Sequence, residues 1–310
     1  MVVVKDVCKK FGDNQVLDKI SFHISPNECT AILGKNGAGK TTLLNIISGT
    51  LKADSGFVRL NMSSNPLKDF KTLKKLSYVS GIKSMLDKDM KLIYSFDNCR
   101  MIYGIERSRY KKRLLELTRQ FGIENCLECM VYQLSLGQRV RGELVCALLS
   151  EPEILFLDEA LIGLDITIKE KILKILYDIK SAGKTTIIYT SHNLFEVERL
   201  CDRIILIDGG RIIFDGNIDT VYKEFSPEYR IDFEIEGRFP DLEDLPVESY
   251  MMDNRILSVM FQRQKVEAAV IIRHVMGRST VKNIKMSEPD IEDTIKKILV
   301  LNDERKIMYD

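Results

Sequence analysis

The sequence has no long hydrophobic run, no tryptophan and almost no excess of charge of either sign. Its longest unbroken apolar stretch is the six residues Leu144 to Leu149, whereas a membrane-spanning helix needs about 20. The 46 lysines and arginines nearly balance the 45 aspartates and glutamates, so no overall field attracts nucleic acid or an acidic membrane. The first residues also lack the apolar stretch of a signal peptide. We therefore expect a chain that does not cross a bilayer by itself.

The even, closely spaced cysteines of a disulfide framework are absent as well. The seven cysteines are scattered along the chain, which favours reduced thiols in the cytosol. Cys126 and Cys129 form a single C-x-x-C pair, and a metal site would need a second pair or a nearby histidine cluster. The three histidines, His23, His192 and His274, lie far away in sequence. Plain thiols are therefore the favoured interpretation, and a metal site is the alternative.

The chain does have enough apolar residues for real cores, 45% of 310, and enough length for about two domains. Up to about residue 225, short β-branched runs alternate with helical stretches, which is typical of an α/β domain around a mostly parallel sheet. Residues 83–145 are helical in period and predict an inserted helical subdomain. Residues 228–310 predict a small accessory α+β domain. The expected strands are Cys29–Leu33, Ile154–Leu157, Thr186–Thr190, Arg203–Ile207 and Arg211–Phe214 in the first domain, and Tyr229–Ile235, Ile256–Phe261 and Val281–Met286 in the second. The expected helices of the second domain are Gln264–Met276 and a final one that opens at Ser287 and Asp290 and runs to about Leu301.

The clearest motif is a glycine-rich segment, G-x-x-x-x-G-K-[ST], which follows an apolar strand and precedes a helical run. Glycines allow backbone N–H groups to surround phosphate oxygens without Cβ clashes. Lys40 supplies a positive charge to the terminal phosphates, and the Thr41 hydroxyl can ligate Mg²⁺. The residues expected to bind the nucleotide here are Gly34, Lys35, Asn36, Gly37, Ala38, Gly39, Lys40, Thr41 and Thr42.

Two acids, Asp158 and Glu159, follow the apolar strand expected at Ile154–Leu157. A buried strand delivers Asp158 to the phosphate side of the sheet, where it can hold Mg²⁺ through its water shell. Glu159 can face an attacking water and take its proton, a contribution of about 10²–10⁴-fold to the rate. Thr41 and Asp158 are thus the expected metal ligands, and Glu159 is the expected general base.

The segment Leu134-Ser135-Leu136-Gly137-Gln138 opens a helix between these two motifs. It resembles the signature sequence of ATP-binding-cassette (ABC) ATPases, usually Leu-Ser-Gly-Gly-Gln. Gly163-Leu164-Asp165 looks like the D-loop of that family, and Thr190-Ser191-His192 ends a strand where the family has its switch histidine. Phe11 lies where the family has an aromatic residue that stacks on adenine. The resemblance covers about residues 1–225, in the family's order and spacing.

This resemblance implies a P-loop ABC ATPase cassette that binds ATP and Mg²⁺ and works in pairs. Ser135, Gly137, Gln138 and Asp165 would then be nucleotide-binding residues, and the anion site at Ser135 and Gly137 would face the γ-phosphate bound by the other subunit. His192 would position the γ-phosphate and the water, next to Asp158 and Glu159. The implied partners are a second cassette, in a homodimer or heterodimer, and integral membrane permease subunits, with the cassette on the cytoplasmic face of the membrane. The short α+β tail is similar to that of the exporter branch, which favours export.

The sequence departs from the family at the Q-loop, where a glutamine normally follows the strand. The expected position falls on Gly81 or Ile82, and neither side chain offers an amide oxygen. Ser80 or a water could replace the glutamine in a working ATPase, or the site could be slow. We favour a working site because Lys40, the acid pair and His192 remain.

Two other functions compete with a transporter subunit. A soluble ABC protein acting on nucleic acid is disfavoured by the neutral charge and by the single cassette. A weakly active regulatory cassette is suggested by the missing glutamine. A further alternative concerns five apolar residues that either dock a permease helix or, as we expect for most of them, form the core of the insertion. They are Tyr94, Phe96, Met101, Ile102 and Tyr103.

Overall fold

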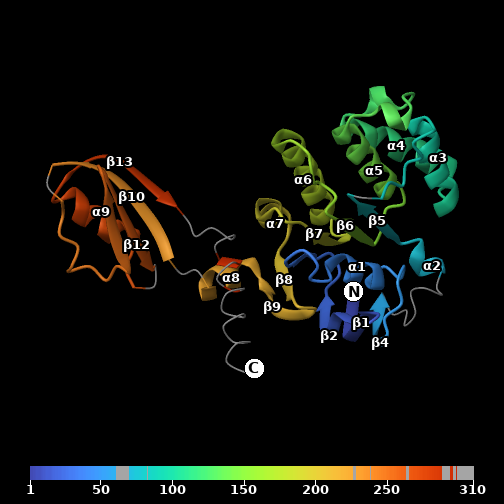
Figure 1. Ribbon diagram of the computed structural model, residues 1–310. Helices are drawn as coiled ribbons and strands as arrows, with labels where there is room; N and C mark the ends of the chain where they lie inside the picture. Colours follow the sequence, from blue (N-terminus) through green and yellow to red (C-terminus); the bar gives the residue numbers. More distant parts are fainter. Residues whose placement is uncertain are drawn as a thin grey trace. The chain divides into compact units, whose positions relative to one another are not determined.

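The computed structural model describes residues 1–60, 70–81, 83–225, 228–237, 239–262 and 265–287, together with Thr294, Ile295 and Ile298. For residues 70, 222–225 and 228 only the backbone is described. The chain divides into two compact units, Met1–Gly216 and Asn217–Asp310 (Figure 1). The sequence suggests a boundary after residue 225. The structure divides before helix α8 (Ile218–Phe225), so this helix belongs to the second unit. Each unit is described by itself.

A six-stranded sheet forms the centre of the first unit, in the order β5-β6-β7-β3-β8-β9. Its strands are β3 (Cys29–Leu33), β5 (Leu76–Ser80), β6 (Ile154–Asp158), β7 (Thr186–Thr190), β8 (Arg203–Asp208) and β9 (Arg211–Asn217). The pairs from β5 across to β8 are parallel, and every residue of β3, β6 and β7 is buried. Continuous apolar runs are typical of parallel strands that are covered on both faces. This arrangement confirms the predicted mostly parallel α/β fold.

A second, antiparallel sheet in the same unit was not expected from the sequence. It has the order β2-β1-β4 and consists of β1 (Val2–Phe11), β2 (Asn14–Ile24) and β4 (Ser55–Leu60). Its pairing register shifts several times, and Asp6 and Lys19 have φ values near +50°, so the alternation of apolar and polar residues is broken. Val2 and Ile20 are buried in one core with the central-sheet residue Ile205.

The helices of the first unit fall into two groups (Figure 1). Those connected to the sheet strands are α1 (Lys40–Ile47), α2 (Phe70–Leu73), α6 (Ile166–Ser181) and α7 (Leu194–Leu200). The helical insertion contains α3 (Leu92–Tyr103), α4 (Arg107–Phe121) and α5 (Leu136–Leu149), with short 3₁₀ turns at Glu124–Cys126 and Val131–Gln133. Glycines at Gly104 and Gly122 end α3 and α4 in the left-handed conformation that glycine adopts most readily.

The buried face of α3 carries Leu92, Ser95, Phe96 and Cys99, at the i, i+3, i+4, i+7 spacing of an amphipathic helix. Of the five apolar residues singled out in this region, Phe96 is therefore in the core and Tyr103 is half-buried. The other three, Tyr94, Met101 and Ile102, are exposed, with Met101 60% and Ile102 67% accessible. The expectation that most of the five form the core of the insertion is wrong, because the helical period places these three off the buried face.

The cysteine expectation also needs a correction, because Cys99 of α3 and Cys146 of α5 form a disulfide. Both residues are buried, and their Cα atoms are 6.4 Å apart, within the range that a disulfide can bridge. The other cysteines, Cys8, Cys29, Cys126, Cys129 and Cys201, are free thiols. The scattered spacing that favoured reduced cysteines gave no sign of this pair.

The second unit contains a four-stranded antiparallel sheet with the order β11-β12-β10-β13. Its strands and helix are β10 (Glu228–Glu236), β11 (Ser249–Asp253), β12 (Ile256–Gln262), β13 (Thr280–Ser287) and α9 (Ala268–Met276). Phe233, Phe261 and Ile271 are the centre of its core. Helix α9 begins later than expected; Gln264, where we placed its start, lies outside the described residues. The expected final helix lies there too, apart from helical backbone at Thr294, Ile295 and Ile298.

Over the ranges that the structure describes, no helix is both long enough and apolar enough to span a bilayer.

Candidate functional site

The glycine-rich loop lies between β3 and α1 and is held from two sides. A side-chain carbon at Gly34 would overlap the carbonyl oxygen of Ile207, on β8. A side-chain carbon at Gly39, where φ is +100°, would lie 2.8 Å from the carbonyl oxygen of Val16, on β2. The backbone can follow this path only with glycine at both positions. No side chain caps the first turn of α1, so its N–H groups stay available to an anion.

Lys40, the first residue of α1, is folded back over this loop. Its Nζ donates hydrogen bonds to the carbonyl oxygens of Gly34, at 2.9 Å, and Lys35, at 3.2 Å. The side chain is buried, and this burial lowers its pKa, although the nearby Glu159 and Asp158 carboxylates oppose that shift. A buried ammonium group that donates its hydrogen bonds to neutral carbonyls is a strong site for phosphate oxygens.

Asp158 ends β6 with its carboxylate surrounded by hydroxyl groups. Its Oδ1 accepts hydrogen bonds from Thr190 Oγ1 at 2.7 Å and from Thr41 Oγ1 at 3.3 Å. Its Oδ2 accepts one from the Tyr78 hydroxyl at 2.9 Å. The donors come from β7, α1 and β5, so one carboxylate joins the loop helix to two neighbouring strands of the sheet.

Tyr78 is a site residue that the sequence analysis missed. It pairs with Phe156 in the β5–β6 register and stacks on that ring, while Ser80 pairs with Asp158. Residues two apart on a strand share a face, so the long Tyr78 side chain reaches the carboxylate diagonally. Burial and then the Asp158 charge raise the pKa of Tyr78, so the phenol stays protonated and acts as a donor. The signal was an aromatic residue with a hydroxyl group in a strand next to the one that ends in Asp158.

Replacing Tyr78 by phenylalanine removes this hydroxyl and keeps the stack. We expect kcat for ATP hydrolysis to fall about three- to tenfold, because a hydrogen bond to a charged group contributes about 1.5–3 kcal/mol and Asp158 keeps two other donors. Steady-state phosphate release measures the change, and Tyr177→Phe, on the exposed face of α6, is the matched control. An unchanged kcat with an unchanged Mg²⁺ dependence would contradict a positioning role.

Glu159 and His192 meet directly at the same edge of the sheet. Glu159 Oε1 and His192 Nε2 are 2.7 Å apart, and both side chains are partly exposed. Glu159 has φ of +51°, which is unusual for a residue with a side chain, and its N–H donates to the Thr190 carbonyl at 3.1 Å. The bond to β7 holds this backbone conformation in place and turns the carboxylate toward the histidine. The predicted catalytic residues Asp158, Glu159 and His192 thus lie together.

The helix tip that resembles the ABC signature is held by a capping box at the start of α5. Ser135 caps α5: its Oγ accepts from Gln138 N–H at 3.2 Å, and Gln138 Oε1 accepts from Ser135 N–H at 2.8 Å. Gly137 packs closely on Ile168 of α6, the helix that Asp165 caps by accepting from Ile168 N–H at 3.0 Å. The two capped helix starts therefore belong to helices that pack on each other, and Ser135, Leu136 and Asp165 are exposed.

Phe11 lies at the end of β1 and is 52% exposed. The ammonium group of Lys9 is 5.5 Å from the centre of its ring. β1 pairs with β2, which carries the Val16 carbonyl that approaches Gly39. The ring is thus an open apolar surface on the sheet beside the phosphate loop, as a base-stacking residue requires.

The Q-loop position is close-packed where the sequence has Gly81. A side-chain carbon there would lie 2.5 Å from the carbonyl oxygen of Glu159, and the Gly81 N–H donates to the Asp158 carbonyl at 3.0 Å. A glutamine therefore does not fit at Gly81 without moving the catalytic strand end. Ile82, the other expected position, lies outside the described residues.

The donor set at this edge of the sheet suits Mg²⁺. The Thr41 hydroxyl and the Asp158 carboxylate are hard oxygen ligands, already adjacent. Mg²⁺ usually takes one or two protein oxygens and completes its shell with water and substrate phosphates. Over the described ranges, no group of three or more histidine, cysteine, aspartate or glutamate side chains is arranged to hold a metal by itself. Cys126 and Cys129 therefore belong to no such group among the described residues.

Comparisons with known proteins agree with this geometry. Residues 17–162 match the family model described as ABC transporter. The chain is 32% identical to the Nod factor export ATP-binding protein I of Cupriavidus metallidurans, over 69% of this chain and 70% of that protein. It is 30% identical to the methionine import ATP-binding protein MetN of Clostridium tetani, over 78% of this chain and 77% of that protein. A solved dimeric ATP-binding cassette in a post-hydrolysis state with ADP and Pi superposes with a TM-score of 0.63 at 25% identity, over 70% of this chain and 99% of that one.

Proposed function

This chain belongs to the family of ABC transporter ATP-binding proteins, and we propose that it powers export by a separate membrane permease through ATP-driven closure of a cassette pair. It is an ATPase of the P-loop ABC fold. The observation that carries the proposal is the exposed tip of α5 at Ser135, which belongs to the helical insertion and not to the loop that holds the buried Lys40. A site divided in this way is completed by a second copy of the cassette.

In the proposed reaction, Glu159 accepts a proton from the water that attacks the γ-phosphorus of ATP. The bond from that phosphorus to the bridging oxygen breaks, and ADP and inorganic phosphate leave. His192, bonded to Glu159 in this structure, holds the water and a γ-phosphate oxygen in line. Lys40 and the N–H groups of the loop stabilise the charge on the terminal phosphates.

Thr41 and Asp158 would hold Mg²⁺, which supplies charge neutralisation at the β- and γ-phosphates. The hydroxyls of Tyr78 and Thr190 keep the Asp158 carboxylate oriented for this. Because Asp158 accepts three hydrogen bonds from protein groups, its position does not depend on a Q-loop glutamine. This supports a working site despite the substitution at Gly81.

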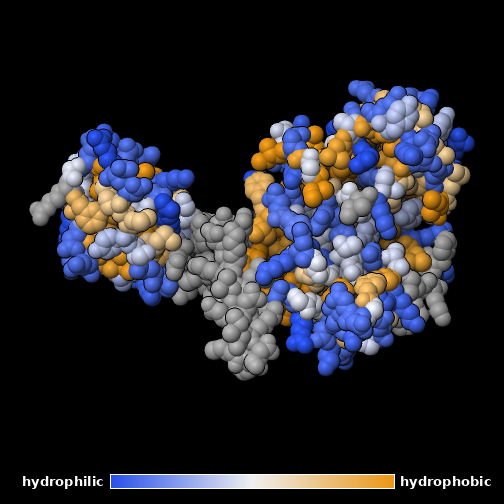
Figure 2. Space-filling view, viewed as in Figure 1, coloured by the Kyte–Doolittle hydropathy of each residue, from blue (hydrophilic) through white to orange (hydrophobic). Residues whose placement is uncertain are grey.

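The cassette pair would close over the tip of α5. Ser135 Oγ, the Gly137 N–H and the positive end of the helix form an anion site. Apolar residues surround it: Leu136, Ile162 and Ile166 are all exposed, Ile166 to 67%. Figure 2 shows hydrophobic residues gathered over α6 and the facing part of the insertion. Contiguous exposed apolar surface marks interaction sites. Loss of the shared γ-phosphate contact after hydrolysis would reopen the pair.

The permease would dock on α3, where Met101 and Ile102 are exposed. Replacing both by glutamate should abolish co-purification of polytopic membrane proteins with the tagged cassette from detergent-solubilised membranes, because it places charge in an apolar contact. The matched control is Leu115→Glu, an exposed apolar residue of α4 in the same insertion. Equal recovery of membrane proteins with the parent cassette, the double variant and Leu115→Glu would contradict docking at α3.

The direction of transport is supported by the relative named for Nod factor export, against the one named for methionine import. Inside-out vesicles that contain the complex test it, because the cassette then faces the medium. ATP-dependent accumulation of a solute in the lumen, measured by mass spectrometry, supports export. ATP-dependent loss of solute from the lumen contradicts it.

The close packing at Gly81 favours a second candidate, a slow cassette that regulates an active partner. Such a protein would bind ATP but release phosphate at the same low rate as its Glu159→Gln variant. Phosphate release from the purified protein, with and without the permease, distinguishes the two functions.

A further inference from the structure

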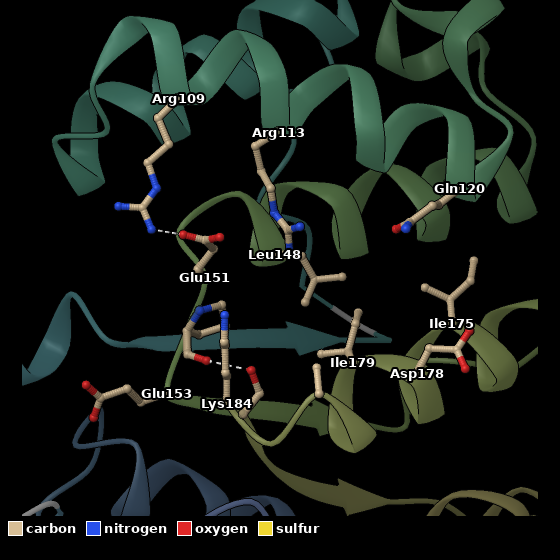
Figure 3. A pocket seen from close by; sticks show the side chains of 13 residues that line it. Arg109, Arg113, Gln120, Leu148, Glu151, Glu153, Ile175, Asp178, Ile179 and Lys184 are labelled. Carbon is tan, nitrogen blue, oxygen red and sulfur yellow. Dashed lines mark hydrogen bonds and ion pairs between the residues drawn. The ribbon is translucent and has the colours of Figure 1, made fainter.

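A cavity of about 590 Å³ opens between the insertion and α6, away from the phosphate loop (Figure 3). Its volume is within the range of sites for small organic ligands. Arg109 and Arg113 reach into it from α4, and Leu148, Ile175 and Ile179 form an apolar wall opposite them. The cavity is therefore amphipathic, with cationic groups on one side and aliphatic groups on the other.

Most of the acidic side chains that line this cavity already have a cationic partner. Arg109 forms an ion pair with Glu151, and Glu153 is paired with Lys75 at 2.6 Å. Two of the three acids that line the cavity are thus already neutralised. The third, Asp178, lies beside Ile175, at the other end of the cavity from Arg109 (Figure 3).

Of the two arginines that line the cavity, Arg113 has the longer ion pair. Its side chain is only 26% exposed, and its nearest carboxylate is Glu116, 3.8 Å from NH1. Its Nε is shielded from solvent and has no hydrogen-bond partner in the part of the chain that the structure describes. Burial lowers the pKa of Arg113, Glu116 opposes this, and the charge of Arg109 adds to it. An anion beside this guanidinium would relieve an existing electrostatic cost.

We propose that this cavity binds a small amphipathic anion, whose carboxylate or phosphate contacts Arg113 and whose hydrocarbon part lies on Leu148, Ile175 and Ile179. A planar guanidinium suits either acid group, because both accept two parallel hydrogen bonds. Lys184, which lines the mouth and forms no ion pair with a described residue, adds a second positive charge.

The cavity touches the far ends of the elements that carry the catalytic groups. Helix α5 begins at the Ser135 cap and ends at Leu149, next to the lining residue Leu148. Helix α6 begins after Asp165, and Ile179 is about 20 Å further along it. Strand β6 starts after Glu153 and ends at Asp158. A ligand here contacts three elements whose other ends carry nucleotide-site groups, and it changes nucleotide affinity if it binds the nucleotide-loaded and nucleotide-free forms with different affinity, which the ADP titration below tests.

In the test, the full-length protein is titrated with 4-phenylbutyrate or with phenyl phosphate, and calorimetry and ligand-observed NMR measure the binding. We expect saturable binding with a Kd of about 1 mM or lower. The neutral amide of 4-phenylbutyrate should bind the parent protein at least about fivefold more weakly than the acid does. The acid should likewise bind Arg113→Met at least about fivefold more weakly than it binds the parent protein. The matched control is Arg119→Met, on the same helix and outside the cavity. The ADP affinity should change at least about fivefold when the probe is saturating.

Each result decides one part of the inference. Binding of the carboxylate alone or the phosphate alone identifies the acid group of the natural ligand. No saturable binding of either probe at about 10 mM overturns the site. Equal affinity for the acid and its amide overturns the role of Arg113 without any variant, so misfolding of Arg113→Met cannot hide the answer. Binding with no change in ADP affinity overturns the coupling.

Discussion

Glu159→Gln is expected to lower kcat for ATP hydrolysis by about 10²–10⁴-fold, because the amide cannot accept the proton of the attacking water. The substitution keeps the shape of the side chain and its contact with His192, which lies 2.7 Å away. ATP binding should persist, since the phosphates are held by other groups. Phosphate release measures the rate, and equilibrium binding of ATP measures the affinity.

The matched control for this prediction is Glu170→Gln, an exposed carboxylate on α6. It should retain the full rate. If Glu159→Gln and the parent protein hydrolyse ATP equally fast, Glu159 is not the base. A stable nucleotide-bound dimer that forms with Glu159→Gln, detected by its mass in solution, would support closure of two cassettes.

Lys40→Met is expected to raise the Kd for ATP roughly 10–100-fold, because it removes a charged hydrogen-bond donor worth about 1.5–3 kcal/mol from the phosphate site. The free energy of unfolding should stay the same or rise, since methionine fills the buried space without the cost of a buried ammonium group. Calorimetric titration with ATP and thermal unfolding measure the two effects.

Lys52→Met is the matched control, an exposed lysine after α1. It should bind ATP with the affinity of the parent protein. An unchanged ATP affinity in Lys40→Met would contradict the phosphate site, and a large loss of stability would show that Lys40 acts mainly in folding.

The parallel sheet was predictable because its strands are continuous apolar runs, and β3 and β7 have the bounds that the sequence suggested. The antiparallel sheet was not, because residues with positive φ at Asp6 and Lys19 interrupt its alternation. Local pattern finds strands that are buried on both faces more readily than irregular strands with one wet face.

The chemistry of the site was readable where it lies in contiguous motifs, as for Lys40 and Glu159. It was not readable where it depends on contacts across strands. Tyr78 reaches Asp158 only through the β5–β6 register, and the Cys99–Cys146 bond forms only because α3 packs on α5. Neither pairing has a signature at fixed spacing. The exposure of Met101 on α3 was also not predictable from composition. Apolar residues alone do not tell which side of a helix is covered by the rest of the fold.

The loop at Gly34 and Gly39 lies between the carbonyl groups of Ile207 and Val16, with the Lys40 ammonium group bonded across it. Its curvature is therefore imposed by β2 and β8 before any nucleotide arrives. The conformational entropy of this segment is lost when the protein folds rather than when ATP binds. Ordering of this loop is therefore a cost of folding, so the energy of the phosphate contacts contributes to affinity instead of to ordering the backbone.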